Sequence, residues 1–117
     1  MWIFKVGVVG AGAMGGGIGQ VATYAGLPVV VKDIDQERLD LARKHVEGIY
    51  QSRIDKGKMT RGLVKEKLDL VEYTLVYADF ADVDIVIEAV PEVMDIKRQV
   101  FRDLDEVCPP DTIFASN

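Results

Sequence analysis

The stretch FKVGVVGAGAMG, residues 4–15, decides the fold. An apolar run ends at Gly10, and the pattern Gly10-x-Gly12-x-x-Gly15 follows at once. With this spacing a strand passes into a helix around the pyrophosphate of a dinucleotide. The three glycines alone are weak evidence, because the chain contains 11 glycines and can match the pattern by chance. The surrounding sequence has to supply the context.

The glycines of this stretch have distinct expected roles. Gly10 permits the tight turn, Gly12 lets the backbone approach the pyrophosphate, and Gly15 allows close packing of helix on strand. Three more follow in the predicted helix: Gly16, Gly17 and Gly19. Each glycine costs about 0.5–1 kcal/mol relative to alanine in a helix. Either a ligand comes close to this backbone, or the helix packs closely on the sheet.

The composition is that of one globular domain over residues 1–117, with 49% apolar and 28% charged residues. The formal net charge of −5 argues against a nucleic-acid partner. Cys108 is the only cysteine, which excludes an intrachain disulfide and favours a reducing compartment. Since no apolar stretch approaches the roughly 18 residues of a membrane span, we expect a cytoplasmic protein without a membrane partner.

Apolar patterning predicts strands that alternate with helices. We expect strands over residues 3–9, 29–33, 71–76, 84–90 and 112–116. We expect helices over residues 13–25, from 36 into the fifties, from 60 to about 70, and over 92–107, with a turn or single helical turn at 79–82. Asp35 and Thr60 are candidate N-caps for the second and third helices.

Strands separated by helices imply a parallel sheet with right-handed crossovers. The expected fold is a Rossmann-type doubly wound α/β sheet of strand order 3-2-1-4-5, with a helical hairpin inserted after strand 2. No helix follows the last predicted strand, and a bare sheet edge is an aggregation liability. We therefore expect the chain to be the N-terminal part of a longer protein.

Asp33 ends the second predicted strand, 18 positions after Gly15. A dinucleotide-binding fold places an acidic residue near there, where it accepts hydrogen bonds from the adenosine ribose hydroxyls. A carboxylate repels a 2′-phosphate, which favours NAD over NADP, although the neighbouring Lys32 weakens this argument. The alternative is a solvated or capping aspartate, with Asp35 the better cap.

The segment Glu88-Ala89-Val90-Pro91-Glu92 follows at the carboxyl end of the fourth predicted strand. Ligands of open α/β sheets bind outside that end, at the switch point between strands one and four. Glu92 and Lys97 lie close together at the start of the next helix. They could serve a ligand, or Glu92 could simply favour a helix N-terminus and Lys97 could form a surface pair with it.

Basic residues crowd the tip of the predicted hairpin: Arg53, Lys56, Lys58, Arg61, Lys65 and Lys67. They indicate either an anionic ligand or a solvated helix face. His45, the only histidine, lies in mid-helix and is interpreted as a surface residue rather than an acid–base catalyst. Cys108 lacks a partner motif and is interpreted as packing.

These features together resemble the N-terminal NAD-binding domain of the 3-hydroxyacyl-CoA dehydrogenase family. The matching segments cover the chain in order: residues 10–18 (GAGAMGGGI), 31–33 (VKD), 56–60 (KGKMT), 84–92 (DIVIEAVPE) with Lys97, and 113–117 (IFASN). The resemblance implies oxidation of an (S)-3-hydroxyacyl-CoA to the 3-ketoacyl-CoA with hydride passing to NAD, in fatty-acid β-oxidation or 3-hydroxybutyryl-CoA metabolism.

The resemblance also implies site residues. Cofactor contacts would come from Gly10, Gly12, Ala13, Met14, Gly15, Asp33, Ala89, Val90, Glu92, Lys97 and Asn117. Lys56 matches a lysine that contacts coenzyme A, whereas Ile49 stands where another such contact needs a hydroxyl. No catalytic residue and no metal site is expected in this chain, because the family's His–Glu pair and its dimerisation domain would follow Asn117. The parent enzyme would be a homodimer through that domain.

Three hypotheses stay open at this stage. The first is the cofactor domain of a 3-hydroxyacyl-CoA dehydrogenase, which alone binds NAD without turnover. The second is a stand-alone NAD-binding or sensing module. The third is a related 3-hydroxyacid or phosphogluconate-type dehydrogenase, against which Asp33 and the run over residues 87–92 argue.

Overall fold

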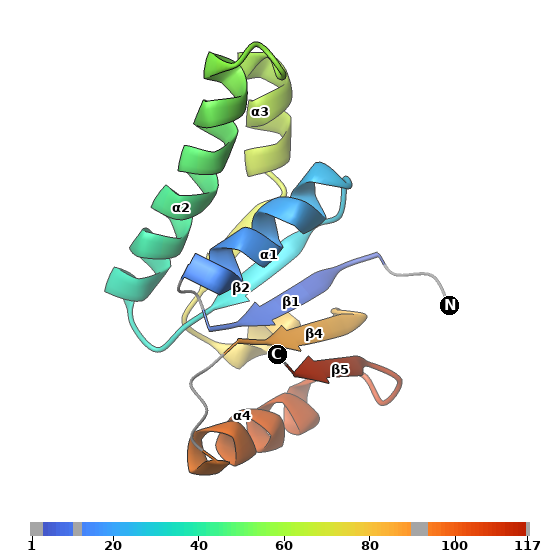
Figure 1. The fold of residues 1–117 in the computed structure, drawn as a ribbon. Helices are drawn as coiled ribbons and strands as arrows, with labels where there is room; N and C mark the ends of the chain where they lie inside the picture. Colours follow the sequence, from blue (N-terminus) through green and yellow to red (C-terminus); the bar gives the residue numbers. More distant parts are fainter. Residues whose placement is uncertain (1–3, 11–12, 90–93, 117) are drawn as a thin grey trace.

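Five parallel strands form one sheet at the centre of the fold (Figure 1). The computed structural model describes residues 4–10, 13–89 and 94–116. The strands are β1 (Val6–Val9), β2 (Val29–Lys32), β3 (Val71–Thr74), β4 (Ile85–Glu88) and β5 (Ile113–Ser116). Their order is β3-β2-β1-β4-β5, as the sequence predicts. The expected doubly wound α/β fold of Rossmann type is confirmed.

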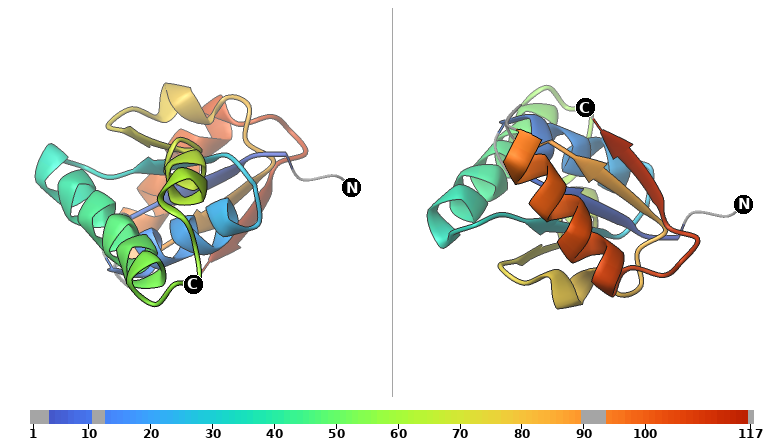
Figure 2. Two further views of the ribbon diagram at one scale, coloured as in Figure 1. Left: turned by 90° about the horizontal axis from the view of Figure 1, so that it is seen from above. Right: turned by 90° about the horizontal axis from the view of Figure 1, so that it is seen from below.

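Helices cover both faces of this sheet. They are α1 (Ala13–Tyr24), α2 (Gln36–Asp55), α3 (Arg61–Leu68), α4 (Met94–Val107) and the short 3-10 helix η1 (Tyr77–Phe80). Helix α1 lies on one face and α4 on the other, as the two turned views show (Figure 2). Helices α2 and α3 form the predicted hairpin after strand 2, and the hairpin extends beyond the sheet (Figure 1).

The strand register aligns the carboxyl ends of the central strands. Val9, at the end of β1, lies opposite Lys32 of β2 and opposite Glu88 of β4. The chain leaves β1 toward β2 on one side and returns to β4 on the other, so this edge is a topological switch point. Whatever follows Val9, Lys32 and Glu88 is therefore gathered at one place.

Two apolar clusters hold the helices on the sheet. On the α1 side, one cluster joins buried residues of β1, β2 and α2: Val6, Val8, Val29, Val31, Leu39 and Ala42. On the α4 side, a second joins Val9, Val30, Phe80, Val83, Val86, Val100 and Leu104. Because both faces are covered, the central strands are apolar at nearly every position, as is usual for buried parallel strands.

Gly7 of β1 is required by packing on the α4 side. A Cβ built on Gly7 would lie 2.7 and 2.9 Å from two ring carbons of Phe80. Phe80 is itself fully buried, so the ring has little room to move away. This glycine precedes the glycine pattern, and nothing in the neighbouring residues predicts its contact with Phe80.

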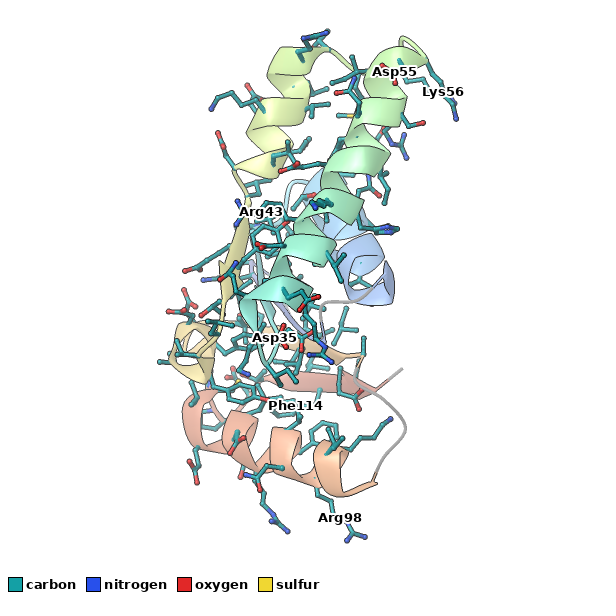
Figure 3. All side chains as sticks on the ribbon, turned by 90° about the vertical axis from the view of Figure 1, so that its left-hand side faces the viewer. Asp35, Arg43, Asp55, Lys56, Arg98 and Phe114 are labelled. Carbon is teal, nitrogen blue, oxygen red and sulfur yellow. The ribbon has the colours of Figure 1, made fainter. Side chains whose placement is uncertain are left out.

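The hairpin has its own small core and the predicted caps. Val46, Tyr50, Met59 and Val64 form a third buried cluster between α2 and α3. The Asp35 carboxylate accepts a hydrogen bond from the Arg38 amide at 2.8 Å, and the Thr60 hydroxyl accepts one from the Leu63 amide at 3.2 Å. Both residues are N-caps, as predicted. Asp35 and Lys56 lie at opposite ends of α2 (Figure 3).

The element after α3 differs from the expectation. The predicted strand over residues 71–76 ends already at Thr74. The Thr74 hydroxyl accepts a hydrogen bond from the Val76 amide at 3.1 Å, which turns the backbone out of the ladder. The expected turn or single helical turn at 79–82 is the 3-10 helix η1, which begins two residues earlier, at Tyr77.

Candidate cofactor and substrate site

The sheet brings three of the predicted cofactor residues to one edge. The Gly10 amide donates to the Lys32 carbonyl at 2.9 Å, and the Ala89 amide donates to the Val9 carbonyl at 2.8 Å. Asp33 follows Lys32 directly. Gly10, Asp33 and Ala89 therefore meet where β1, β2 and β4 end, although 79 positions separate the first from the last.

The glycine pattern opens helix α1. Gly10 has a φ of 100°, a conformation that favours glycine, and α1 begins three residues later at Ala13. Ala13, Met14 and Gly15 form the first turn of α1, whose free amides and dipole can bind an anion. Gly12 lies outside the described residues.

Close packing does not explain the later glycines of α1. A Cβ at Gly19 would meet Val31 and Val29 at 3.8 and 4.0 Å, which is ordinary contact. A Cβ at Gly17 would lie 4.0 Å from Nε2 of His45. Alanine would fit at both positions, so close packing of the helix, which was the alternative to a nearby ligand, does not explain Gly17 and Gly19.

Asp33 and Asp35 divide two roles between them. Asp35 caps α2, and its second carboxylate oxygen pairs with the Arg38 guanidinium. Asp33 is half-buried at the carboxyl edge, where its carboxylate accepts a hydrogen bond from the Ile34 amide at 2.7 Å. The interpretation of Asp35 as the cap is confirmed, and Asp33, the predicted ribose-binding residue, lies at the carboxyl edge.

Lys32 turns to the other side of the sheet. Its ammonium lies 4.1 Å from the ring centre of Tyr77 in η1, and the residue is 8% exposed. Burial lowers the pKa of Lys32, while the carboxylates of Asp33 and Asp103 oppose that shift. A lysine held against Tyr77 does not offer an exposed cation to a 2′-phosphate. The objection to NAD that Lys32 raised is thereby weakened.

Lys97 is largely buried and lies beside a carboxylate of β4. Its Nζ lies 3.2 Å from Oε1 of Glu88, and the two side chains are 13% and 0% exposed. Glu88 ends β4, and Lys97 lies in the first turn of α4. Sequence reasoning missed Glu88 as a partner of Lys97; the available signal was a lone acidic residue closing an apolar strand. The other predicted residues here, Val90, Glu92 and Asn117, lie outside the described residues.

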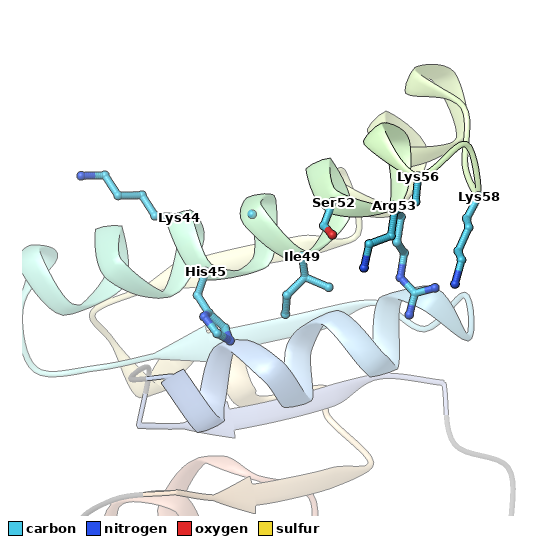
Figure 4. Close-up of a pocket in the computed structure, with 8 residues that line it drawn as sticks. Lys44, His45, Ile49, Ser52, Arg53, Lys56 and Lys58 are labelled. Carbon is cyan, nitrogen blue, oxygen red and sulfur yellow. The ribbon is translucent and has the colours of Figure 1, made fainter.

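A groove of about 580 Å³ runs along α2 (Figure 4). Arg53, Lys56 and Lys58 lie at one end of it, Lys44 and His45 at the other, and Ile49 and Ser52 between them. Because His45 approaches Gly17 of α1, the groove leads from the hairpin tip toward the helix that the glycine pattern opens.

Three of the six predicted hairpin cations converge in this groove. The Arg53 guanidinium lies 4.9 Å from the ring centre of Tyr24 at the end of α1. The Arg53 carbonyl accepts hydrogen bonds from the Lys58 and Met59 amides, so the turn itself holds Lys58 beside Arg53. Lys65 instead pairs with Asp69 at 3.1 Å along α3, and neither Arg61 nor Lys67 lines the groove. The tip therefore combines a cation cluster with a solvated helix.

The remaining candidates behave as interpreted. His45 is an exposed residue of α2. Cys108 packs against the α4-side cluster, and burial raises the pKa of its thiol. Among the described residues, no group of three His, Cys, Asp or Glu side chains could hold a metal ion. No helix in the described part of the chain is long and apolar enough to cross a membrane.

Comparison with known families decides the relationship of this chain. Residues 5–117 match the model of the 3-hydroxyacyl-CoA dehydrogenase NAD-binding domain. The chain belongs to this family. The predicted family and the predicted cofactor, NAD, are thereby confirmed for the 3-hydroxyacyl-CoA dehydrogenase domain.

Relatives of this NAD-binding domain include subunits of fatty-acid oxidation enzymes. The fatty acid oxidation complex subunit alpha of Psychrobacter arcticus is 44% identical over 115 residues, covering 98% of this chain and 16% of that protein. The peroxisomal fatty acid beta-oxidation multifunctional protein MFP2 of Arabidopsis thaliana is 38% identical over 115 residues, which again cover 98% of this chain and 16% of that protein. The chain thus spans about a sixth of these relatives.

Solved structures show the same fold in this family. The (S)-3-hydroxybutyryl-CoA dehydrogenase PaaH1 of Ralstonia eutropha matches with a TM-score of 0.94 and 34% identity, over 99% of this chain and 41% of that one. FadB2 of M. tuberculosis matches with a TM-score of 0.95 and 36% identity, over 100% of this chain and 41% of that one. The domain spans about two fifths of these structures.

Proposed function

We propose that this chain binds NAD at the carboxyl edge of its sheet and serves an enzyme that oxidises (S)-3-hydroxyacyl-CoA to 3-ketoacyl-CoA. The observation that carries the proposal is the meeting of Gly10, Asp33 and Ala89 at the switch point of a chain from this NAD-binding family. The names of the relatives, fatty-acid oxidation subunits and 3-hydroxybutyryl-CoA dehydrogenases, support the substrate class.

The residues at this edge fit a dinucleotide. The first turn of α1, with Ala13, Met14 and Gly15, offers amides to the pyrophosphate, and the positive φ of Gly10 lets the chain turn there. The Asp33 carboxylate can accept hydrogen bonds from ribose hydroxyls. Gly12 would lie against the pyrophosphate with the first turn of α1. On the β4 side, Ala89 and Lys97 would contact the nicotinamide half, together with Val90, Glu92 and Asn117. Bound NAD would supply the hydride acceptor.

The same proposal places the coenzyme A part of the substrate in the α2 groove. Arg53, Lys56 and Lys58 offer three cations at one end, which suits the phosphates of coenzyme A. Stacking on Tyr24 fixes Arg53 before a ligand arrives. Ile49 lines the groove but supplies no hydroxyl; Ser52, one turn further along α2, lines it as well.

We expect no turnover by this chain alone. Removal of hydride from a hydroxyl requires a base for the hydroxyl proton. The only histidine, His45, lies on α2 beside the groove, not at the carboxyl edge. The His–Glu pair, and the domain through which the parent would form a homodimer, are expected beyond Asn117. A cytoplasmic location stays our proposal, since a single cysteine suits a reducing compartment.

Calorimetry and a turnover assay test this proposal together. The chain should bind NAD more tightly than NADP, because Asp33 repels a 2′-phosphate, and should not oxidise NADH in the presence of acetoacetyl-CoA. Absence of NAD binding would refute the cofactor site. Preference for NADP would favour the 3-hydroxyacid-type alternative, and robust turnover would show that a base in this chain was overlooked.

A further inference from the structure

The charged pair between β4 and α4 is buried at an unusual place. Glu88 is fully buried, and its carboxylate lies 3.2 Å from Nζ of Lys97, which is 13% exposed. Glu88 follows Val86 on the α4 face of the strand, where the neighbouring side chains form the apolar cluster under α4. The last row of this face, at the carboxyl ends of the strands, also holds buried Lys32 and Thr74, so Glu88 lies where the apolar face gives way to polar side chains.

Stability alone gives little reason for this pair. Removing two charges from water is costly, and apolar residues of similar size often replace a buried ion pair without loss. Lys97 also lies in the first turn of α4, where the helix dipole disfavours a cation. The Glu88 carboxylate offsets that unfavourable placement, but it does not explain why a lysine stands there.

The position of the pair points to the cofactor edge. Glu88 lies opposite Val9 in the register of β1 and β4, and the next amide, that of Ala89, donates to the Val9 carbonyl at 2.8 Å. Gly10 follows Val9 directly. The pair thus lies at the β4 side of the switch point, while Asp33 lies at the β2 side.

We infer that Glu88 is a positioning residue, which holds the Lys97 ammonium at the switch point before the cofactor binds. The inference rests on the proposed function, in which Lys97 contacts NAD. A free lysine loses much rotamer freedom when a ligand fixes it. Glu88 meets that cost during folding, so that NAD encounters an ordered cation.

A double-mutant cycle tests this role by NAD affinity. We expect Lys97→Met and Glu88→Gln each to weaken NAD binding about tenfold. The double variant should bind NAD no more weakly than Lys97→Met, because the inferred effect of Glu88 on NAD passes through Lys97. Unchanged affinity in Glu88→Gln or in Lys97→Met, or additive losses in the double variant, would overturn the inference. Failure of the unmodified chain to bind NAD would instead refute the proposed function.

A matched control and a second measurement guard against loss of folding. Asp82→Asn removes a pair with Lys5, 3.0 Å apart at the opposite edge of the sheet, and should leave NAD affinity unchanged. If Glu88→Gln does not fold, NMR of the lysine ammonium groups replaces it. In the unmodified chain without NAD, we expect an ammonium signal that is protected from hydrogen exchange and absent in Lys97→Met, whereas the signal of buried Lys32 should remain in that variant. Rapid exchange of the Lys97 ammonium would overturn the inference.

Discussion

At the scale of residues, charged residues around the end of β2 have different environments. Lys32 turns toward Tyr77 and the α4 face, whereas Asp33 remains at the carboxyl edge near Gly10. The carboxylate of Asp35, two positions later, caps the N-terminus of α2. Lys32, Asp33 and Asp35 therefore have different contacts. Substitutions at Asp33 and Asp35 should separate cofactor binding from helix capping.

Asp33→Ala should weaken NAD binding by about 1–3 kcal/mol, the range for losing a charged hydrogen-bond partner. Its effect on the free energy of unfolding is measured alongside, since the Asp33 carboxylate also accepts a hydrogen bond from the Ile34 amide. Asp35→Ala, the control, should lower the free energy of unfolding by about 1 kcal/mol and leave NAD affinity unchanged. Calorimetry and urea unfolding measure the two effects. Equal NAD affinity of Asp33→Ala and the unmodified chain would exclude Asp33 from the site.

Gly7→Ala should destabilise the chain by about 1–3 kcal/mol, because the new methyl group would press on the buried Phe80 ring. Gly48→Ala is the matched control: apart from its chain neighbours and the surrounding backbone of α2, no described atom lies within 4 Å of the added methyl. That change should stabilise by about 0.5–1 kcal/mol. Urea unfolding compares them. A Gly7→Ala variant as stable as the unmodified chain would contradict the close packing of the Phe80 ring on Gly7.

The raised pKa values of two partly buried tyrosines predict that the folded chain loses stability at alkaline pH. Burial raises the pKa of Tyr73 and of Tyr77 to about 12, from an ordinary value of 10.0. The folded state therefore holds these protons longer than the unfolded chain, and stability falls as pH rises from 10 to 12. Replacing both with phenylalanine should make that fall shallower, as followed by urea unfolding at several pH values. An unchanged slope would show that neither phenol is buried as described.

At the scale of elements, the sequence predicts features that depend on neighbouring residues, but not the contacts between separate elements. Asp35 and Thr60 predict where their helices begin, because an N-cap depends only on a few neighbouring residues. The strand order follows from the alternation of strands and helices. Nothing local reveals that Phe80 lies on Gly7, that Glu88 pairs with Lys97, or that Arg53 stacks on Tyr24, because each contact joins separate elements.

The α2 groove yields a prediction for the hairpin as an element. Arg53→Ala and Lys56→Ala should each weaken coenzyme A binding by about 1.5–3 kcal/mol, since each removes a charged partner of a phosphate. Arg53→Lys should restore little, because lysine lacks the planar group that stacks on Tyr24. Lys65→Ala, on α3 and outside the groove, is the control. Calorimetric titration with coenzyme A measures all four, and equal losses in the control would refute the groove as the site.

At the scale of the whole molecule, charge and topology agree. Residues 1–65 carry a net +4 and residues 66–117 a net −9. The positive part contains the glycine pattern and the hairpin groove, the two places proposed for phosphate groups. The negative part contributes the β4 side of the switch point, where Glu88 and Lys97 lie. The sequence predicts this division, but only the fold shows that the groove leads from the hairpin tip toward α1.

The most direct test of the account is an NMR titration of the chain with NAD, followed at the backbone amides. The largest shift changes should occur at Gly10, Asp33, Ala89 and Lys97, which different elements bring to the carboxyl edge. Changes that are largest along the α2 groove, from Lys44 to Lys58, or no changes at saturating NAD, would contradict it.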